Sequence, residues 1–357
     1  MNATRRFLVL VLSCVAGFAM SGPIGAAPAS ASSAIGINGN DYDSIVALTG
    51  YPGWVRMAPE YPLDTNAYAV QMVNARSRGL KVLVTGLGSF QACNCAHSMP
   101  VVGNQTQQQN YVNYIEQLLT IGNGPDAIGP WNEPNLEGFG GPGSTWQQDA
   151  NLQADVAWAA AVVGWHGTFF SSALAGYGSS NSSDPRVPLN WWKNELAGDA
   201  SWAGRFSVLD VHAYGWGYAK TLKTIEDQYN PGVMQAKMQD IIAYSGGGWK
   251  KLAWTEYGAP SNGDIVDPGS CNPNVVSQWH GTPTFQYNWY LDAHAFWKAW
   301  EDAGRQLWGK LAYRDTDNPY ERDCHNSPFH YGLIGSTGLR PAAGAYQVEA
   351  TRVRPPP

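Results

Sequence analysis

Charged side chains are scarce in this chain of 357 residues, in which Asp, Glu, Lys and Arg together make up only 14%. Basic residues number 22 against 28 acidic ones, and the formal net charge at pH 7 is −6. A chain of this sign is repelled by phosphate backbones, which argues against DNA, RNA or another polyanion as its main ligand. We therefore expect no nucleic-acid partner.

Long apolar runs are missing after residue 31, where no segment reaches the roughly 18 uninterrupted apolar residues of a membrane helix. The first residues, MNATRR, then FLVLVLSCVAGFAM, then GAAPASASSA, have the three parts of a secretory leader. We predict a signal peptide over 1–31, cleaved near Ala29 to Ala31, and a secreted or periplasmic protein without a membrane span. A lipoprotein is the alternative, because VLSC ending at Cys14 is similar to a lipidation site, but the apolar run continues past it.

Cysteine is also rare, with five residues, of which Cys14 leaves with the leader. An even number of cysteines in an exported chain favours disulfides. Cys93 and Cys95 together would close a very small ring, so we expect a cross pairing in which each reaches Cys271 or Cys324. A four-thiolate zinc site is the alternative, which an oxidising compartment disfavours.

Two kinds of cofactor motif are missing as well. No G-x-G-x-x-G follows a predicted strand, which argues against a dinucleotide site and an open doubly wound sheet. The chain after the leader has neither an HExxH segment nor an H-x-H pair ending its first predicted strand, which argues against a metal-dependent hydrolase. We expect no metal and no organic cofactor.

Apolar runs bounded by turn signals are present throughout, and stretches with helical periodicity separate most of them. This alternation is typical of a mainly parallel sheet. Eight such units in a chain of this length predict an α/β fold, the (β/α)8 TIM barrel, as a single catalytic domain over 32–357. The predicted strands are 34–38, 53–58, 80–86, 127–131, 168–173, 207–214, 251–257 and 306–313, and helical stretches include 111–119, 146–165, 285–300 and 341–353.

Two glutamates stand where predicted strands end. Glu133 follows the fourth strand in IGPWNEPNLEGF, and Glu256 ends the seventh in KLAWTEYGAP. Strand ends of a barrel converge on one rim, where active sites of this fold lie. Two carboxylates in one pocket are what glycoside hydrolysis requires, one protonated for the leaving oxygen and one ionised to attack the anomeric carbon. For either glutamate alone, a helix-capping or surface role is the alternative.

Both motifs resemble those of the retaining glycoside hydrolases of clan A, barrels in which Asn-Glu-Pro ends the fourth strand and Thr-Glu ends the seventh. The resemblance spans nearly the whole chain after the leader and implies Glu133 as acid/base and Glu256 as nucleophile. WNEPN, residues 131–135, is most similar to the branch of β-xylosidases and α-L-iduronidases. TEYG, residues 255–258, is closer to the cellulase-like branch, so the family within the clan stays open.

Other positions match the same template. Arg56, near the end of the second predicted strand, stands where similar enzymes keep an arginine beside the nucleophile, and a fixed cation there would hold Glu256 ionised. Asn132, next to the acid, resembles the residue that hydrogen-bonds the sugar 2-hydroxyl. A plain surface charge is the alternative for Arg56.

The sixth predicted strand, SVLDVHAYG, adds three polar side chains. Asp210, His212 and Tyr214 share one strand face because side chains alternate with a period of two. His212 would contact the substrate or the acid/base, and Tyr214 would donate to Glu256. A core histidine is the alternative for His212.

Aromatic residues are plentiful, with 16 Trp and 18 Tyr, and ring faces can grip neutral, hydroxylated ligands. Trp254 shares a strand face with Glu256 and is expected to pack beneath it. Core packing is the alternative for each tryptophan. Four tryptophans are predicted at or near loop rims, and we expect two of them to stack on sugar rings: Trp131, Trp191, Trp192 and Trp216. Tyr313, Arg314 and Asp315 follow the eighth predicted strand and are expected to shape a subsite.

These observations predict an exported, monomeric, retaining glycosidase that acts on a carbohydrate substrate by double displacement. A transglycosidase on the same scaffold and a carbohydrate-binding protein without catalysis are the alternatives. Nothing in the sequence selects the polysaccharide, its linkage, or endo against exo cleavage.

Overall fold

The computed structural model describes residues 34–39, 41–50, 53–93, 95–176, 183–214, 231–259, 283–312, 333–335 and 338–353. The predicted leader, 1–31, lies outside these residues. Among the described helices, none is long and apolar enough to cross a membrane.

The main sheet has nine strands in the order β7-β6-β4-β2-β1-β11-β10-β9-β8, and every pair in it is parallel. All eight predicted strands are present in it. The strands are β1 (Ala34–Asn38), β2 (Trp54–Met57), β4 (Lys81–Thr85), β6 (Ala127–Gly129), β7 (Thr168–Phe169), β8 (Leu174–Ala175), β9 (Val208–Tyr214), β10 (Lys251–Gly258) and β11 (Leu307–Ala312).

β7 and β8 are the two ends of one segment, 168–175, which closes the sheet into a ring. β7 pairs with β6, and β8 pairs with β9. Between them, parallel bridges join Asn132 to Ala173 on one side and Phe170 to Val208 on the other. This segment is therefore the fifth strand of an eight-strand barrel, and the predicted (β/α)8 fold is confirmed.

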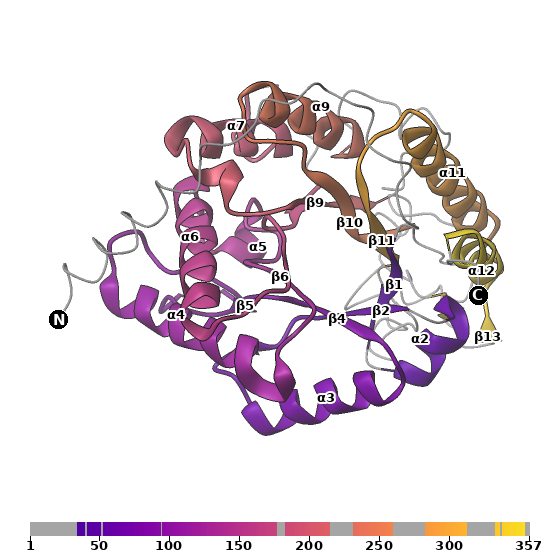
Figure 1. Ribbon diagram of the computed structural model, residues 1–357, viewed down its shortest axis with the longest axis horizontal. Helices are drawn as coiled ribbons and strands as arrows, with labels where there is room; N and C mark the ends of the chain where they lie inside the picture. Colours follow the sequence, from indigo (N-terminus) through magenta and orange to yellow (C-terminus); the bar gives the residue numbers. More distant parts are fainter. Residues whose placement is uncertain are drawn as a thin grey trace, which may run out of the picture.

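The longer helices surround the strands on the outside of the ring (Figure 1). Local signals in the sequence set their ends: α6 begins at a capping box between Thr145 and Gln148 and ends at Gly164, whose φ of 68° suits glycine. The helices are α2 (Tyr42–Thr49), α3 (Thr65–Ser77), α4 (Gln105–Thr120), α5 (Glu137–Gly140), α6 (Trp146–Val163), α7 (Pro188–Gly198), α9 (Pro231–Tyr244), α11 (Pro283–Asp302) and α12 (Pro341–Val353), with 3₁₀ turns η1 (Ile121–Asn123) and η2 (Trp202–Gly204).

Two small strand pairs were not predicted. β3 (Glu60–Tyr61) pairs with β5 (Leu87–Gly88) in parallel, and β12 (Ile334–Gly335) pairs with β13 (Gly338–Leu339) in antiparallel fashion. Segments of two residues are too short to show a periodic pattern, which explains the omission.

The interior of the ring is apolar near the N-terminal ends of the strands, its lower part, and polar near their C-terminal ends, its upper part. The ring of Trp308 packs edge-on against Trp54 at 4.8 Å and Phe170 at 4.7 Å between centroids. These aromatic side chains belong to a buried cluster with residues from the first halves of several strands, such as Val208 and Ala253. Polar side chains come later in the same strands, so they gather near the strand ends.

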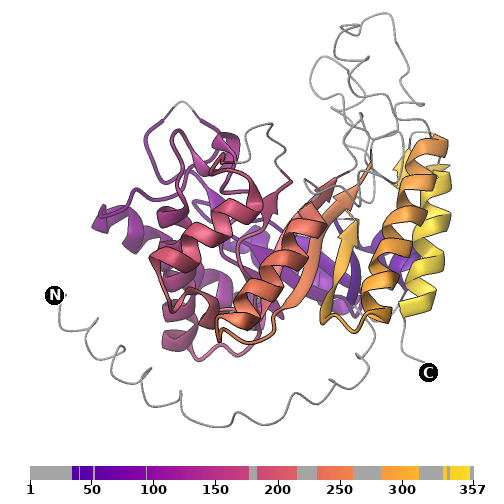
Figure 2. The ribbon, with the colours of Figure 1, turned by 90° about the horizontal axis from the view of Figure 1, so that it is seen from above.

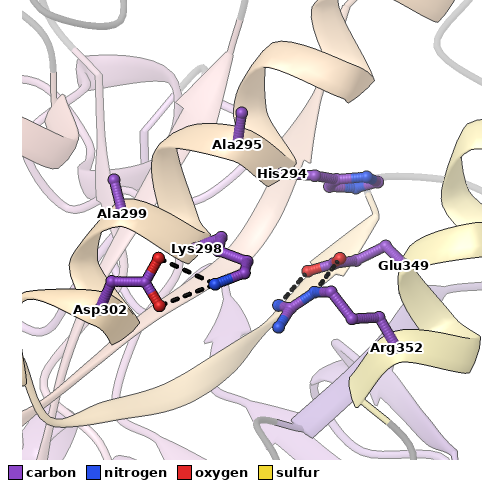
Figure 3. Close-up of a pocket in the computed structure, with 7 residues that line it drawn as sticks. All are labelled: His294, Ala295, Lys298, Ala299, Asp302, Glu349 and Arg352. Atoms are coloured by element: carbon purple, nitrogen blue, oxygen red, sulfur yellow. Dashed lines mark hydrogen bonds and ion pairs between the residues drawn. The ribbon is translucent and has the colours of Figure 1, made fainter.

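On the outer wall, α11 and α12 lie side by side (Figure 2), and a buried ion-pair network fastens α12 to the barrel. Lys310 of β11 donates to Glu349, and both side chains are almost fully buried. Arg352 donates to Glu349 through Nε at 2.6 Å and Nη2 at 2.7 Å, and to Glu301 at 2.7 Å. Glu349 and Arg352 line a pocket of about 370 Å³ together with residues of α11, and Figure 3 shows their side chains.

This network yields a stability prediction. Glu349→Gln leaves the buried Lys310 ammonium without its anionic partner, so the free energy of unfolding should fall by about 3 kcal/mol. Urea denaturation at neutral pH measures the difference. The matched control is Asp302→Asn, which breaks the exposed pair with Lys298 and should cost less than about 0.5 kcal/mol. Equal losses in the two variants would contradict the importance of the buried pair.

Candidate active site

Two glutamates far apart in the sequence meet at the C-terminal ends of the barrel strands. Glu133 lies in the loop after β6, Glu256 lies near the end of β10, and each is only 7% exposed. One oxygen of each carboxylate and one ring nitrogen of His212 all lie within 4.8 Å of one another. The two acids therefore face each other across one small, nearly dry space.

The backbone at Glu133 has an unusual conformation. Its φ is 47°, in the left-handed region that residues other than glycine rarely adopt. Backbone hydrogen bonds hold it there, from Glu133 N to Ala173 O at 2.8 Å and from Leu136 N to Glu133 O at 3.0 Å. Strain of this kind persists only where neighbouring contacts fix the backbone, and it is concentrated at functional sites.

Asn135 fixes the far end of the same loop and was not singled out from the sequence. Its side-chain oxygen accepts from Ala175 N at 2.9 Å, and its nitrogen donates to Ala175 O at 3.0 Å and to Arg186 O at 2.9 Å. The amide thus pairs with the end of β8 as a neighbouring strand would. The second Asn of WNEPN is a structural residue that anchors the loop carrying Glu133.

Glu256 accepts hydrogen bonds on both oxygens. Arg56 donates to Oε1 and Tyr214 donates to Oε2. Burial alone would raise the pKa of this carboxyl, but the charges of His212 and Arg56 and the hydrogen bond from Tyr214 outweigh it and lower the pKa. The site therefore holds Glu256 in its ionised form, and the predicted neighbours Arg56 and Tyr214 are in place.

Arg56 is a buried cation with several fixed partners. Besides Glu256, it donates to Thr85 Oγ1 at 2.9 Å, to Asn38 Oδ1 at 3.1 Å and to Asn132 Oδ1 at 2.5 Å. The planar guanidinium has its donors in a rigid fork, so these contacts fix its orientation. The alternative of a surface charge is excluded, since Arg56 is 5% exposed.

Thr85 and Asn38 were missed in the sequence, although each occupies the last position of its strand. The register pairs Asn38 of β1 directly with Arg56 of β2, and Arg56 with Leu83 of β4. A search for polar side chains at every predicted strand end would have found both.

His212 lies between the two glutamates and is fully buried. Its Nδ1 is 2.7 Å from Glu133 Oε1 and 3.4 Å from Glu256 Oε2, and the register places it directly beside Glu256. At this distance the imidazole and the Glu133 carboxyl form a hydrogen bond. The predicted contact between His212 and Glu133 is confirmed.

The spacing of Glu133, His212 and Glu256 would also suit a metal ion. Arg56, however, already supplies a positive charge to one oxygen of Glu256, and Tyr214 occupies the other. A cation would have to displace both and would lie beside the guanidinium. We therefore keep the expectation that this group binds no metal.

Asp210 lies below His212 on the same inward face of β9 and is 2% exposed. Its two oxygens accept from Thr255, at 3.1 Å from the backbone N and at 2.6 Å from Oγ1. Burial raises its pKa to about 6, although the charges of His212 and Arg56 and the hydrogen bonds from Thr255 act in the opposite direction. Period-two alternation predicted its face and not its partner.

Three of the four tryptophans predicted near the rim are core residues, so the expectation that two of the four stack on sugar is wrong. Trp131 is fully buried, with its ring 5.9 Å from that of Phe90 and its Nε1 donating to Phe139 O at 2.9 Å. Trp191 and Trp192 of α7 are also core residues. Indole rings suit cores and rims equally, so position along the chain alone could not separate the two roles.

The prediction that Trp254 packs beneath Glu256 is also wrong. Trp254 faces outward and packs against α11, with its ring 4.9 Å from Trp297 and 5.9 Å from Phe296. The period-two argument fails here because the ladder between β10 and β9 shifts register between Ala253 and Glu256. One extra residue therefore separates two side chains that regular alternation would place on one face.

The expected cross pairing of cysteines is wrong for Cys93 and Cys95, which form a disulfide with each other in the loop after β5. Their Cα atoms are 5.3 Å apart. Six of the residues singled out from the sequence lie outside the described residues: Cys271, Cys324, Trp216, Tyr313, Arg314 and Asp315.

Comparison with known proteins supports the fold. No protein-family model matches the chain, and a search of curated proteins finds no match. Among solved structures, a fungal β-1,4-galactanase aligns with a TM-score of 0.60 and 14% identity, over 89% of this chain and 100% of that one. A GH5_18 from Streptomyces cattleya in complex with GlcNAc aligns with a TM-score of 0.58 and 16% identity, over 92% and 82%.

The β-glycosidase BGL167 is similar at the same level, with a TM-score of 0.60 and 13% identity over 88% of this chain and 86% of that one. Identities this low establish the fold alone. The chain therefore shares its fold with these glycoside hydrolases, as the resemblance in sequence motifs implied.

The buried Asp210 predicts a pH dependence of stability. Its pKa of about 6 in the fold lies above the value near 3.9 of an unfolded chain. The native state then binds more protons than the unfolded state between these values, so its stability falls as pH rises through them. Asp210→Asn removes the titration and should gain roughly 2 kcal/mol relative to the parent protein between pH 4 and 7.

Urea denaturation of both proteins at several pH values measures this difference. Comparison of the pair isolates one carboxyl, because every other titrating group is shared. A difference that stays constant across the range would contradict the raised pKa.

Proposed function

We propose that this chain is a retaining glycoside hydrolase that cleaves glycosidic bonds of an oligo- or polysaccharide. One observation carries the proposal: two buried carboxylates approach within 4.8 Å in surroundings that differ in kind. Glu256 has a cation and a phenol as donors, whereas Glu133 has an imidazole. Environments that separate two carboxyl groups in this way typically assign one the role of acid and the other that of nucleophile.

The proposed reaction has two steps. Glu133 transfers its proton to the glycosidic oxygen while Glu256 attacks the anomeric carbon, so the bond to the leaving group breaks and a covalent glycosyl ester forms. Glu133, now a carboxylate, takes a proton from water, and that water displaces Glu256 from the anomeric carbon. Two inversions at one carbon retain its configuration.

The separation of the carboxylates supports retention. Retaining enzymes place them about 5–5.5 Å apart, whereas inverting enzymes leave about 6.5–9.5 Å for a water molecule between acid and base. One oxygen of Glu133 lies within 4.8 Å of one oxygen of Glu256, a close approach that is compatible with the shorter class.

We assign Asn132 a role in substrate binding. It accepts from Arg56 through Oδ1, so we assign its Nδ2 group to the 2-hydroxyl of the bound sugar. Hydrogen bonds to this hydroxyl strengthen in the transition state of glycosidases. His212 is assigned to Glu133 as the partner that positions it.

The structural neighbours support carbohydrate as the substrate class. Their names include a β-1,4-galactanase and a β-glycosidase, and one was solved with GlcNAc. We extend only the class to this chain, because the sugar depends on rim loops that differ between such enzymes. The leader-like N-terminus leads us to propose that the enzyme acts outside the cytoplasm as a single catalytic domain.

Chemical rescue tests the two roles after a glycan panel has identified a cleaved substrate. Glu256→Ala should lose turnover, and azide should restore cleavage by occupying the vacated space and giving a glycosyl azide of inverted configuration. Glu133→Ala should also lose turnover on substrates with poor leaving groups. On a substrate with a good leaving group, the glycosyl ester on Glu256 still forms without the acid, and azide, which needs no general base, should attack it and give a glycosyl azide of retained configuration.

Glu137→Ala is the matched control, since Glu137 is an exposed acid on α5 close to the same loop and should leave turnover unchanged. Rescue at neither Glu133 nor Glu256 would refute the assignment. Products longer than the substrate would show that a sugar replaces water as acceptor. Binding of a glycan without any cleavage would indicate a carbohydrate-binding protein.

A further inference from the structure

β10 contains one residue more than the facing stretch of β9, and its ladder with β11 is irregular at the same place, where it offsets an extra residue of β11 at Trp308. On the β9 side, Ala253 pairs with Asp210 and Glu256 pairs with His212, so two residues of β10 oppose one of β9. On the β11 side, Trp254 pairs with Lys310 and Tyr257 pairs with Ala312, and again two residues oppose one. Thr255 is the residue common to both irregular stretches, which makes it the extra residue of a β-bulge.

The bulge decides which side chain enters the barrel. Ala253 belongs to the buried cluster inside the ring, and regular alternation would place Thr255 inward and Glu256 outward. Because Thr255 is extra, Glu256 takes the inward position beside His212. The next residue, Tyr257, packs outward against α11, with its hydroxyl 3.1 Å from His294 Nε2.

A bulged residue loses its place in the hydrogen-bond ladder, and buried backbone groups without partners are costly. At Thr255, side chains replace the ladder. Its N–H and its hydroxyl both donate to Asp210, at 3.1 Å and 2.6 Å. Its carbonyl accepts from Asn38 Nδ2 at 2.9 Å.

The two side chains that hold Thr255 are themselves fixed. The backbone N–H of Asp210 donates to Ser171 Oγ at 2.9 Å. Asn38 also donates to Ala312 O at 2.9 Å and accepts from Arg56 at 3.1 Å. The bulge is thereby linked to the same arginine that donates to Glu256.

We propose that Asp210 is a positioning residue, which holds the bulge at Thr255 and so keeps Glu256 pointing into the barrel against Arg56. Its contact with Glu256 is indirect, through the backbone of the adjacent residue. The effect of Asp210 on catalysis rests on the proposed function, whereas its effect on the placement of Glu256 does not.

A measurement that is independent of activity tests the placement. The pKa of Glu256 is determined by NMR with carboxyl-¹³C glutamate, and the spectrum of Glu256→Gln identifies its resonance. Asp210→Ala removes both acceptors, so Glu256 should withdraw from Arg56 and Tyr214 and its pKa should rise by about one unit or more. Asp210→Asn keeps one acceptor for the Thr255 N–H and should leave the pKa of Glu256 at its parent value.

The direction of the change in the pKa of Glu256 separates a positioning role of Asp210 from a purely electrostatic effect of its charge. Asp210, with a pKa of about 6, is already neutral at the lower pH where Glu256 titrates. Loss of any remaining negative charge would lower the pKa of Glu256 and could not raise it. A rise in Asp210→Ala together with no change in Asp210→Asn is thus specific to the loss of the hydrogen bonds.

If Asp210→Ala does not fold, Thr255→Val provides the second variant. It keeps the shape of the side chain and removes only the hydroxyl that donates to Asp210. A smaller rise in the pKa of Glu256 is expected. An unchanged or lowered pKa in the folded variants would overturn the proposal.

On a chromogenic glycoside that the parent enzyme cleaves, folded Asp210→Ala should lose about 100-fold in kcat with little change in KM, since a displaced nucleophile slows chemistry more than binding. Asp210→Asn should retain kcat within a few-fold. If Glu256 proves not to be the nucleophile, the NMR result still decides the positioning proposal, and the two failures remain distinguishable.

Discussion

The ion pair between Arg56 and Glu256 is the interaction on which the arrangement of the barrel mouth depends. A charge taken out of water is tolerated only with a partner and with its remaining donors and acceptors filled. Arg56 meets this demand through Thr85, Asn38 and Asn132, which come from β4, β1 and the loop after β6. The need to satisfy one buried guanidinium therefore ties together strands on one side of the ring and, through Glu256, joins them to the opposite side.

The same constraint explains why the two glutamates differ. Glu256 lies where positive charge is concentrated, and Glu133 is turned toward His212 by a backbone that is anchored to the fifth strand. Neither environment belongs to one segment of the chain. Each environment is assembled from strand ends that only barrel closure brings together. The fifth strand is split into β7, which pairs with β6, and β8, which pairs with β9, and the residues between and after them hold the loop of Glu133.

Much of this arrangement follows from the sequence. The strand positions were predictable because apolar runs and turn residues mark them, and His212 and Tyr214 were placed on one face because regular strands alternate their side chains. Arg56 was assigned through the resemblance to similar enzymes. Asn38 and Thr85 could have been found from their positions at strand ends, but their hydrogen-bond partners, like those of Asn135, lie on other segments that no local pattern reports. Trp254 was assigned to the wrong face because a bulge leaves no signature in a run such as KLAWTEYG. Trp131 was misplaced because aromatic residues fill cores and line rims with equal ease.

The apolar lower part of the barrel bears on how molecules enter and leave the site. Among the described residues, Trp308, Trp54 and Phe170 pack together in the interior beneath the polar side chains. In the proposed reaction, sugar, departing group and water would all use the opening at the strand ends. Under the proposed mechanism, the first product has to vacate the space above Glu133 before water can reach the glycosyl ester. The order of release and entry would then be set by the floor of the barrel, a layer that never contacts the substrate.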